Sequence, residues 1–95
     1  MKTPVLLLPN LDIPFTVTTD ASQAAIGAVL SQLGQDDGLS HPVAFESRKL
    51  KEAEQNYPVH ELELLAIVHA LRTWRVYLFG RRFQVFTDHR SLTYL

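Results

Sequence analysis

The spacing of apolar residues changes from a period of two to a helical period and back, which limits the chain to folds that pair a sheet with a helix. Residues 13–20 alternate between two sides, as in a half-buried strand. One side carries Phe15, Val17 and Thr19, and the other carries Thr16, Thr18 and Asp20. Two more short apolar runs, 25–32 and 43–47, are separated by a segment with an Asp-Gly turn signal. The three runs predict an antiparallel meander of three strands.

A helical period begins after Pro58, a residue that the first turn of a helix accepts. Residues 61–79 contain neither proline nor glycine, and Gly80 then provides a stop. At about 100° per residue, one side of this segment carries the apolar stripe Leu64, Ile67, Ala70, Leu71, Trp74 and Leu78. We therefore expect one long helix that covers the sheet with this stripe.

Alternation returns in residues 83–88, which predict a fourth strand. A strand that is reached through a crossover helix normally runs parallel to a partner in the same sheet. The expected fold class is therefore α/β, with an antiparallel meander, a long helix and a parallel fourth strand. Residues 89–95 resemble the start of a further helix that ends without a cap, so we expect the chain to be incomplete at its C-terminus.

The composition predicts one small soluble domain. The chain has 95 residues, and 46% of them are apolar, but no run approaches the roughly 20 apolar residues of a membrane helix. Residues 1–11 contain two prolines and predict an extended linker, and residues 12–95 predict the domain. Cysteine is absent, which excludes structural disulfides, thiolate catalysis and cysteine-ligated zinc.

Charge divides the chain into two unlike halves. Nine basic and ten acidic residues give a net charge of −1, so the chain lacks the strong positive charge of many nucleic-acid-binding domains. Residues 1–47 hold one basic and five acidic residues, whereas residues 48–95 hold eight basic and five acidic ones. Of the arginines, Arg90 is favoured for contact with phosphate over Arg81 and Arg82, which lie at the other end of the fourth strand.

Three carboxylates are the strongest candidates for a functional site. Asp20 and Asp88 end two strands that we expect to be parallel neighbours, so both should project from the carboxyl edge of the sheet. An Asp after a strand is also common in turns and helix caps. Glu63 falls at the edge of the apolar stripe and should point toward the sheet, unlike Glu61, although extension to solvent at the helix end is the alternative.

These acids form an oxygen-only ligand set. Oxygen ligands without a thiol suit Mg²⁺ or Mn²⁺ rather than zinc. His60 and Glu63 also have the i, i+3 spacing of some carboxylate–histidine metal sites, which is a weaker candidate. The sequence therefore favours a divalent-metal site made by Asp20, Glu63 and Asp88.

Six stretches of the chain carry a resemblance to a known family. They are residues 14–22 (PFTVTTDAS), 26–32 (IGAVLSQ), 41–45 (HPVAF), 47–50 (SRKL), 63–66 (ELLA) and 87–92 (TDHRSL). In this order they resemble the ribonuclease H domain that follows the reverse transcriptase of gypsy-type LTR retrotransposons. Residues 4–9 also resemble the segment that joins polymerase to nuclease in such polyproteins. The resemblance spans nearly the whole chain.

The resemblance implies a ribonuclease H-like fold and a metal-dependent nuclease. By it, Asp20, Glu63 and Asp88 are catalytic residues that bind two Mg²⁺ or Mn²⁺ ions, with Asp20 bridging both. It further implies hydrolysis of the RNA strand of RNA–DNA hybrids inside the cell, in a cytoplasmic particle or the nucleus. The reverse transcriptase domain of the same polyprotein is an expected partner, and no membrane is involved. The residues expected to contact nucleic acid are Ser22, His89 and Arg90.

One departure from the family supports a different function. Family members continue past Leu95 with a further strand and helix, and that region supplies a fourth metal-binding acid. Without it, Phe86, Leu92, Tyr94 and Leu95 should be exposed, and such an edge favours a homodimer through the C-terminal part. The alternative function is thus a non-catalytic ribonuclease H-like fragment that acts as a structural or protein-binding module.

Overall fold

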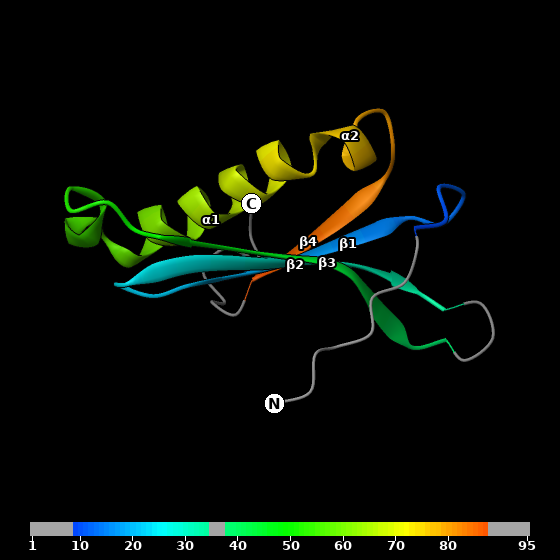
Figure 1. Ribbon diagram of the computed structural model, residues 1–95, viewed down its shortest axis with the longest axis horizontal. Helices are drawn as coiled ribbons and strands as arrows, with labels where there is room; N and C mark the ends of the chain where they lie inside the picture. Colours follow the sequence, from blue (N-terminus) through cyan, green and yellow to red (C-terminus); the bar gives the residue numbers. More distant parts are fainter. Residues whose placement is uncertain (1–8, 35–37, 88–95) are drawn as a thin grey trace.

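The computed structural model describes residues 9–34 and 38–87, which form one sheet covered on one face by helices (Figure 1). The elements in chain order are β1 (Phe15–Ala21), β2 (Ala25–Leu33), β3 (Ser40–Lys49), η1 (Glu54–Asn56), α1 (Val59–Thr73), α2 (Arg75–Leu78) and β4 (Phe83–Thr87). Within this described part, no helix is long and apolar enough to cross a membrane.

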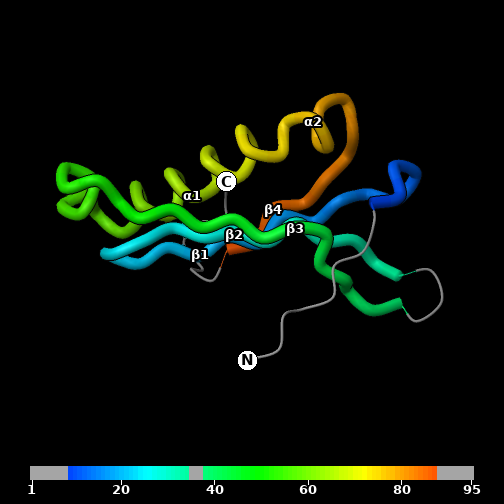
Figure 2. The backbone as a smooth tube through the Cα atoms, in the orientation of Figure 1, coloured from blue at the N-terminus to red at the C-terminus, as the bar shows by residue number. Residues whose placement is uncertain are grey.

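The strand order of the sheet is β3-β2-β1-β4, and the predicted pairing is confirmed. β1 pairs with β2 and β2 pairs with β3 in antiparallel fashion, whereas β1 and β4 are parallel. Val17 in β1 lies opposite Leu30 on one side and Val85 on the other. Figure 2 shows the chain leaving β3, passing through the helices and returning to the sheet as β4 beside β1. This crossover creates the parallel pair.

β3 is longer than the five residues predicted from the apolar run at 43–47. It begins at Ser40 because Pro42, which lacks an N–H, is accommodated by a shift of register. Leu30 pairs with Ala44 and Ser31 pairs with Pro42, so Val43 is the extra residue of a bulge. The residues at the two ends of β3 are polar and do not alternate with apolar ones, so the sequence did not indicate that they belong to the strand.

The apolar residues that the helices bury form a single row with a spacing of four. This row consists of Leu62, Ala66, Ala70, Trp74 and Leu78. The prediction that Leu64 belongs to the core is wrong, because 48% of its surface is exposed. A row of i, i+4 positions winds about 40° around the helix per turn, which follows the twist of the sheet. A single helical wheel does not follow this winding. It therefore assigned Leu64 to the core and left out Leu62 and Ala66 in the first turns.

The predicted single helix is interrupted at Trp74. Its φ and ψ angles are −106° and 24°, outside the helical range, and separate α1 from α2. Just before this point the Thr73 hydroxyl donates to the carbonyl of His69 at 2.8 Å, a back-bond that often bends helices. The bend keeps the Trp74 ring buried in the core. Gly80, with a φ of 73°, then ends the helical segment as predicted.

Two clusters of buried side chains hold the helices to the sheet. The main cluster contains Phe15, Val17, Ala28, Leu30, Val43, Ala70, Trp74 and Leu78. A smaller cluster under the first turns of α1 contains Ile26, Leu50, Leu62 and Ala66, and Ala21 packs against it. The smaller cluster therefore fixes the start of α1 over the end of β1.

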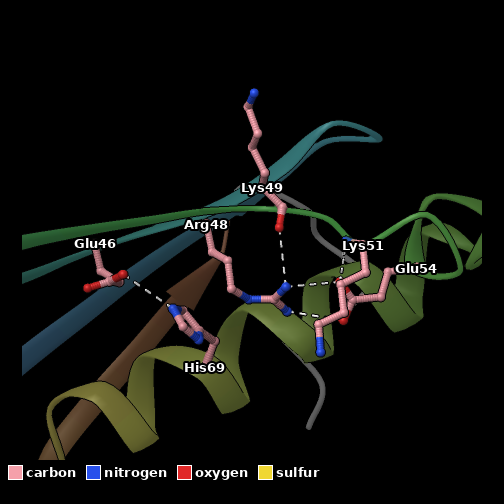
Figure 3. Close-up of polar contacts among 6 residues, drawn as sticks. All are labelled: Glu46, Arg48, Lys49, Lys51, Glu54 and His69. Atoms are coloured by element: carbon pink, nitrogen blue, oxygen red, sulfur yellow. Dashed lines mark hydrogen bonds and ion pairs between the residues drawn. The ribbon is translucent and has the colours of Figure 1, made fainter.

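An ion pair joins the end of β3 to the turn that leads into α1 (Figure 3). Arg48 donates to both carboxylate oxygens of Glu54, at 3.0 and 3.1 Å, and the backbone N–H of Lys51 donates to the same carboxylate at 2.7 Å. The bond from Arg48 and the one from Lys51 lower the pKa of Glu54 from 4.5 to about 2. This network determines where the chain turns before α1.

Glu54→Gln should make the fold less stable at pH 7 and less sensitive to acid. The folded-state pKa of Glu54 lies below its unfolded value, so its stabilising effect is present above pH 4.5 and disappears as the pH falls toward 2. Urea unfolding at several pH values between 7 and 2 measures this change in the free energy of unfolding. The exposed neighbour Glu52 provides the matched control Glu52→Gln, for which the stability profile should stay that of the wild type. A wild-type profile in Glu54→Gln would contradict this account of the ion pair.

Candidate active site

Asp20 lies near the carboxyl end of β1 and is exposed. Because Phe15, Val17 and Thr19 are buried under the helices, the alternation of the strand places Asp20 on the other face of the sheet. Across the antiparallel pair it lies opposite Gly27. The carboxylate is thus accessible from solvent at this end of the sheet.

An open groove begins at Asp20 and crosses the neighbouring strands. It is lined by Thr18, Thr19, Asp20, Gly27, Ala28, Val29, Phe45, Glu46 and Ser47. Gly27 leaves the space beside Asp20 without a side chain, and half of the Phe45 surface is exposed. A substrate or an ion can approach Asp20 along this groove.

Glu63 lies in the second turn of α1 and is only 6% exposed. The sequence prediction that it points toward the sheet is therefore confirmed, and the alternative of a solvent-extended side chain is wrong. Glu61, two positions earlier, is exposed as predicted. Leu62 and Ala66, which flank Glu63 on the helix, pack in the cluster that contains Ile26.

The packing of α1 brings Glu63 and Asp20 to the same end of the sheet. Ile26, which lies under the first turns of α1, pairs with Ala21, and Ala21 directly follows Asp20. Figure 1 shows these turns above the hairpin that joins β1 to β2. The two carboxylates therefore lie at one end of the sheet, with Glu63 buried on the side of the helices and Asp20 exposed on the opposite face.

The third predicted acid, Asp88, lies outside the described residues. The described part of β4 ends at Thr87, which lies opposite Thr19, the residue before Asp20. The buried Thr19 hydroxyl donates to the carbonyl of Phe86 at 3.5 Å and holds the two strands in this register. The parallel pairing thus extends to the two residues that precede Asp20 and Asp88 in the sequence.

The three predicted contacts with nucleic acid, Ser22, His89 and Arg90, stay a prediction. His89 and Arg90 lie outside the described residues. Ser22 is exposed in the turn between β1 and β2, and its hydroxyl accepts bonds from the N–H groups of Ala24 and Ala25, at 3.2 and 3.1 Å. Its first role is therefore to close the turn next to Asp20.

Sequence reasoning missed two polar links that position α1. One is the Arg48–Glu54 pair, and the other joins Nε2 of His69 to a carboxylate oxygen of Glu46 in β3 at 3.4 Å (Figure 3). The partners are 6 and 23 residues apart. Neither spacing is that of one helix face, so no sequence pattern indicated these pairs.

The donor chemistry of the site fits a hard divalent cation. Asp20 and Glu63 offer carboxylate oxygens, and the chain contains no thiol that would favour zinc. Within residues 9–34 and 38–87, no group of three His, Cys, Asp or Glu side chains is placed to hold an ion. The described residues alone therefore do not form a complete ligand set, and the sequence candidate for a further ligand is Asp88.

Comparison with known proteins gives a consistent set of matches. A family model described as "RNase H-like domain found in reverse transcriptase" matches residues 10–95. Two Drosophila melanogaster proteins, the retrovirus-related Pol polyproteins from transposon 297 and from transposon gypsy, are each 48% identical to the chain. The alignments cover 100% and 95% of this chain but only 8% of each polyprotein.

A solved structure has a similar fold. The foamy viral protease-reverse transcriptase in complex with an RNA/DNA hybrid superposes with a TM-score of 0.75. The match covers 88% of this chain and 11% of that one at 19% sequence identity. The strand order and the helix on one face are therefore shared with a segment of that protein.

Proposed function

Since the chain belongs to the RNase H-like domain family found in reverse transcriptase, we propose that it is the nuclease segment of a retroelement Pol polyprotein. Its reaction would be the metal-dependent hydrolysis of the RNA strand of RNA–DNA hybrids. The chain spans less than a tenth of the Pol polyproteins that it matches, so the nuclease would act as one part of a larger protein.

One observation carries this proposal: a buried carboxylate, Glu63, lies at the same end of the sheet as the exposed Asp20. Burial of a carboxylate is unfavourable and is typical of sites where a cation or a reaction uses it. The carboxyl end of parallel strands is also where open α/β sheets place their ligands. Position and chemistry together support the proposal of a site at this end of the sheet.

Asp20, Glu63 and Asp88 would hold the divalent ions. At this position the carboxylates would supply divalent-ion chemistry, namely activation of a water molecule and stabilisation of the leaving oxygen of a phosphodiester. The carboxylates serve as ligands and need not accept protons. Packing of Leu62 and Ala66 keeps Glu63 in position, and the bond from Thr19 to the carbonyl of Phe86 sets the spacing between β1 and β4.

The proposed substrate is the RNA strand of a hybrid. Proteins distinguish RNA from DNA by contacts to the 2′-hydroxyl in a wide and shallow minor groove. Ser22, two residues after Asp20, is exposed beside the site, and we assign it, with His89 and Arg90, to contacts with nucleic acid. The foamy viral protein of similar fold is bound to an RNA/DNA hybrid in one structure and to double-stranded DNA in another.

Glu63→Gln should reduce hybrid cleavage by about 10²-fold or more, because a ligand charge is lost where metal ions stabilise the transition state. The assay follows a labelled RNA–DNA hybrid with Mg²⁺ or Mn²⁺, in the polypeptide that carries this chain within its polyprotein. The matched control is Glu61→Gln, the same change two positions earlier on the exposed side of α1, which should cleave at the wild-type rate. If both variants cleaved the hybrid at the same rate, Glu63 would not be part of the site.

The alternative function remains a non-catalytic structural or protein-binding module. A wild-type polypeptide that binds hybrid but cleaves none with either ion would establish it in place of the nuclease. Neither the matched relatives nor the described residues, 9–34 and 38–87, support the homodimer that the sequence suggested.

A further inference from the structure

The end of the sheet where β1 and β4 begin exposes several large apolar side chains. Val76 and Phe79 are 87% and 78% exposed, and Leu33 and Phe83 lie nearby. Three arginines, Arg75, Arg81 and Arg82, are exposed among them. We call these seven residues the entry surface.

Two grooves join six of these residues, and the seventh, Val76, directly follows Arg75 in α2. One lies between the starts of β1 and β4 and is lined in part by Ile13, Leu33 and Phe83. The other surrounds the turn from α2 to β4 and is lined in part by Phe79 and, again, Phe83. Arg81 lines both grooves. Apolar and basic side chains therefore form one surface rather than scattered exposures.

The charge of the entry surface is positive. Among the described residues that line the two grooves, none is acidic. Arg81 donates to the carbonyl of Leu11 at 3.0 Å, a neutral group, so its charge is not cancelled by this bond. Asp12 is the acidic residue nearest to this bond in the sequence. A complementary surface would be apolar with carboxylates around it.

The polypeptide joins the domain at this same surface. The side-chain amide of Gln32 donates to the carbonyls of Asn10 and Ile13, at 2.7 and 2.8 Å, and its oxygen accepts from the N–H of Asn10 at 2.9 Å. Gln32 is buried, so these bonds hold the segment from Asn10 to Ile13 against β2. Whatever precedes residue 9 in a longer protein is thus attached next to the entry surface.

We propose that the entry surface docks the domain that precedes this chain in its polyprotein, through an apolar and acidic patch on that domain. This inference rests on the proposed function, which makes the chain one segment of a Pol polyprotein. A tethered partner has an effective concentration in the millimolar range, so a surface of this modest size suffices. Contact with nucleic acid alone would use the arginines but would not bury Val76 and Phe79.

Cysteine labelling tests this docking, because the chain has no cysteine of its own. Val76→Cys and, as a matched control, Val59→Cys are placed in a polypeptide that carries this chain behind its preceding domain. Val59 starts α1 at the other end and is 51% exposed, so the labelling rate at position 59 should not depend on docking. Docking should slow labelling at position 76 by about tenfold relative to the same polypeptide with an added Phe79→Ser change, as measured by alkylation and peptide mass spectrometry.

A second change checks that the protection comes from the surface itself. Phe79→Ser together with Val76→Cys should restore fast labelling at position 76 while hybrid cleavage continues. Equal labelling rates at position 76 with and without the Ser change would overturn the proposal. Protection of position 76 only after hybrid is added would also overturn the proposal, because the entry surface would then bind nucleic acid. Labelling needs neither metal nor Asp20, so loss of docking with intact cleavage would leave the proposed function standing.

Discussion

Replacing Asp20 by asparagine is expected to reduce hybrid cleavage by about 10³-fold or more, since metal ions contribute several kcal/mol to the stabilisation of such transition states. The change keeps the size of the side chain and removes its charge. Asp20 is exposed and outside both buried clusters, so the fold should persist. Cleavage of a labelled hybrid, together with far-UV circular dichroism, separates lost chemistry from lost structure.

Asp12 provides the matched control for Asp20. It is also an exposed aspartate, and it precedes β1, so it lies at the other end of that strand. Asp12→Asn removes the same charge and should cleave at the wild-type rate. If Asp12→Asn and Asp20→Asn lost activity equally, general electrostatics rather than a site at Asp20 would explain the effect.

Phe15→Ala is expected to destabilise the fold by about 3–5 kcal/mol. Phe15 is 1% exposed at the start of β1, and its ring lies 6.0 Å from that of Tyr77. Removing it leaves a cavity between the sheet and α2. Since a domain of this size is stable by roughly 5–10 kcal/mol, the variant should unfold at much lower urea concentrations.

Phe86 provides the matched control for Phe15. It lies in the neighbouring strand β4, and 52% of its surface is exposed. Phe86→Ala keeps the backbone carbonyl that accepts the Thr19 hydroxyl, so the strand register is preserved. Its effect on urea unfolding should stay within about 0.5 kcal/mol. Similar losses in the two variants would mean that the core is not where the structure places it.

The sequence predicted the sheet well because each strand has a simple pattern. The alternation of buried and exposed residues in β1 matches the prediction, and the crossover rule correctly made β4 its parallel neighbour. The helix was predicted less well. The break at Trp74 depends on a local bond from Thr73 and on tertiary packing. The spacing of apolar residues indicates neither of these.

The candidate site was predicted from charge and position. Burial of Glu63 followed from its place on the helix beside apolar residues, and the end of β1 followed from the alternation that reaches Asp20. The interactions that hold the site in place were not predictable. The Arg48–Glu54 pair joins the end of a strand to a short 3₁₀ turn, and only the folded chain brings these residues together.

The two ends of the sheet have opposite chemistry. Asp20 and Glu63 lie where β1 ends, whereas the arginines and exposed apolar residues of the entry surface lie where β1 and β4 begin. A domain built in this way can present its carboxylates to a substrate while its other end contacts the protein that carries it. Both assignments are testable independently, because they use different residues and different measurements.

Metal titration tests the central claim, that Asp20 belongs to a divalent-metal site that cleaves hybrid, most directly. Mn²⁺ and Mg²⁺ are titrated calorimetrically into wild type, Asp20→Asn and Asp12→Asn, and hybrid cleavage is followed in the same samples. The account predicts that wild type and Asp12→Asn bind the ions and cleave, whereas Asp20→Asn loses both properties. Metal binding and cleavage that persist in Asp20→Asn would contradict it.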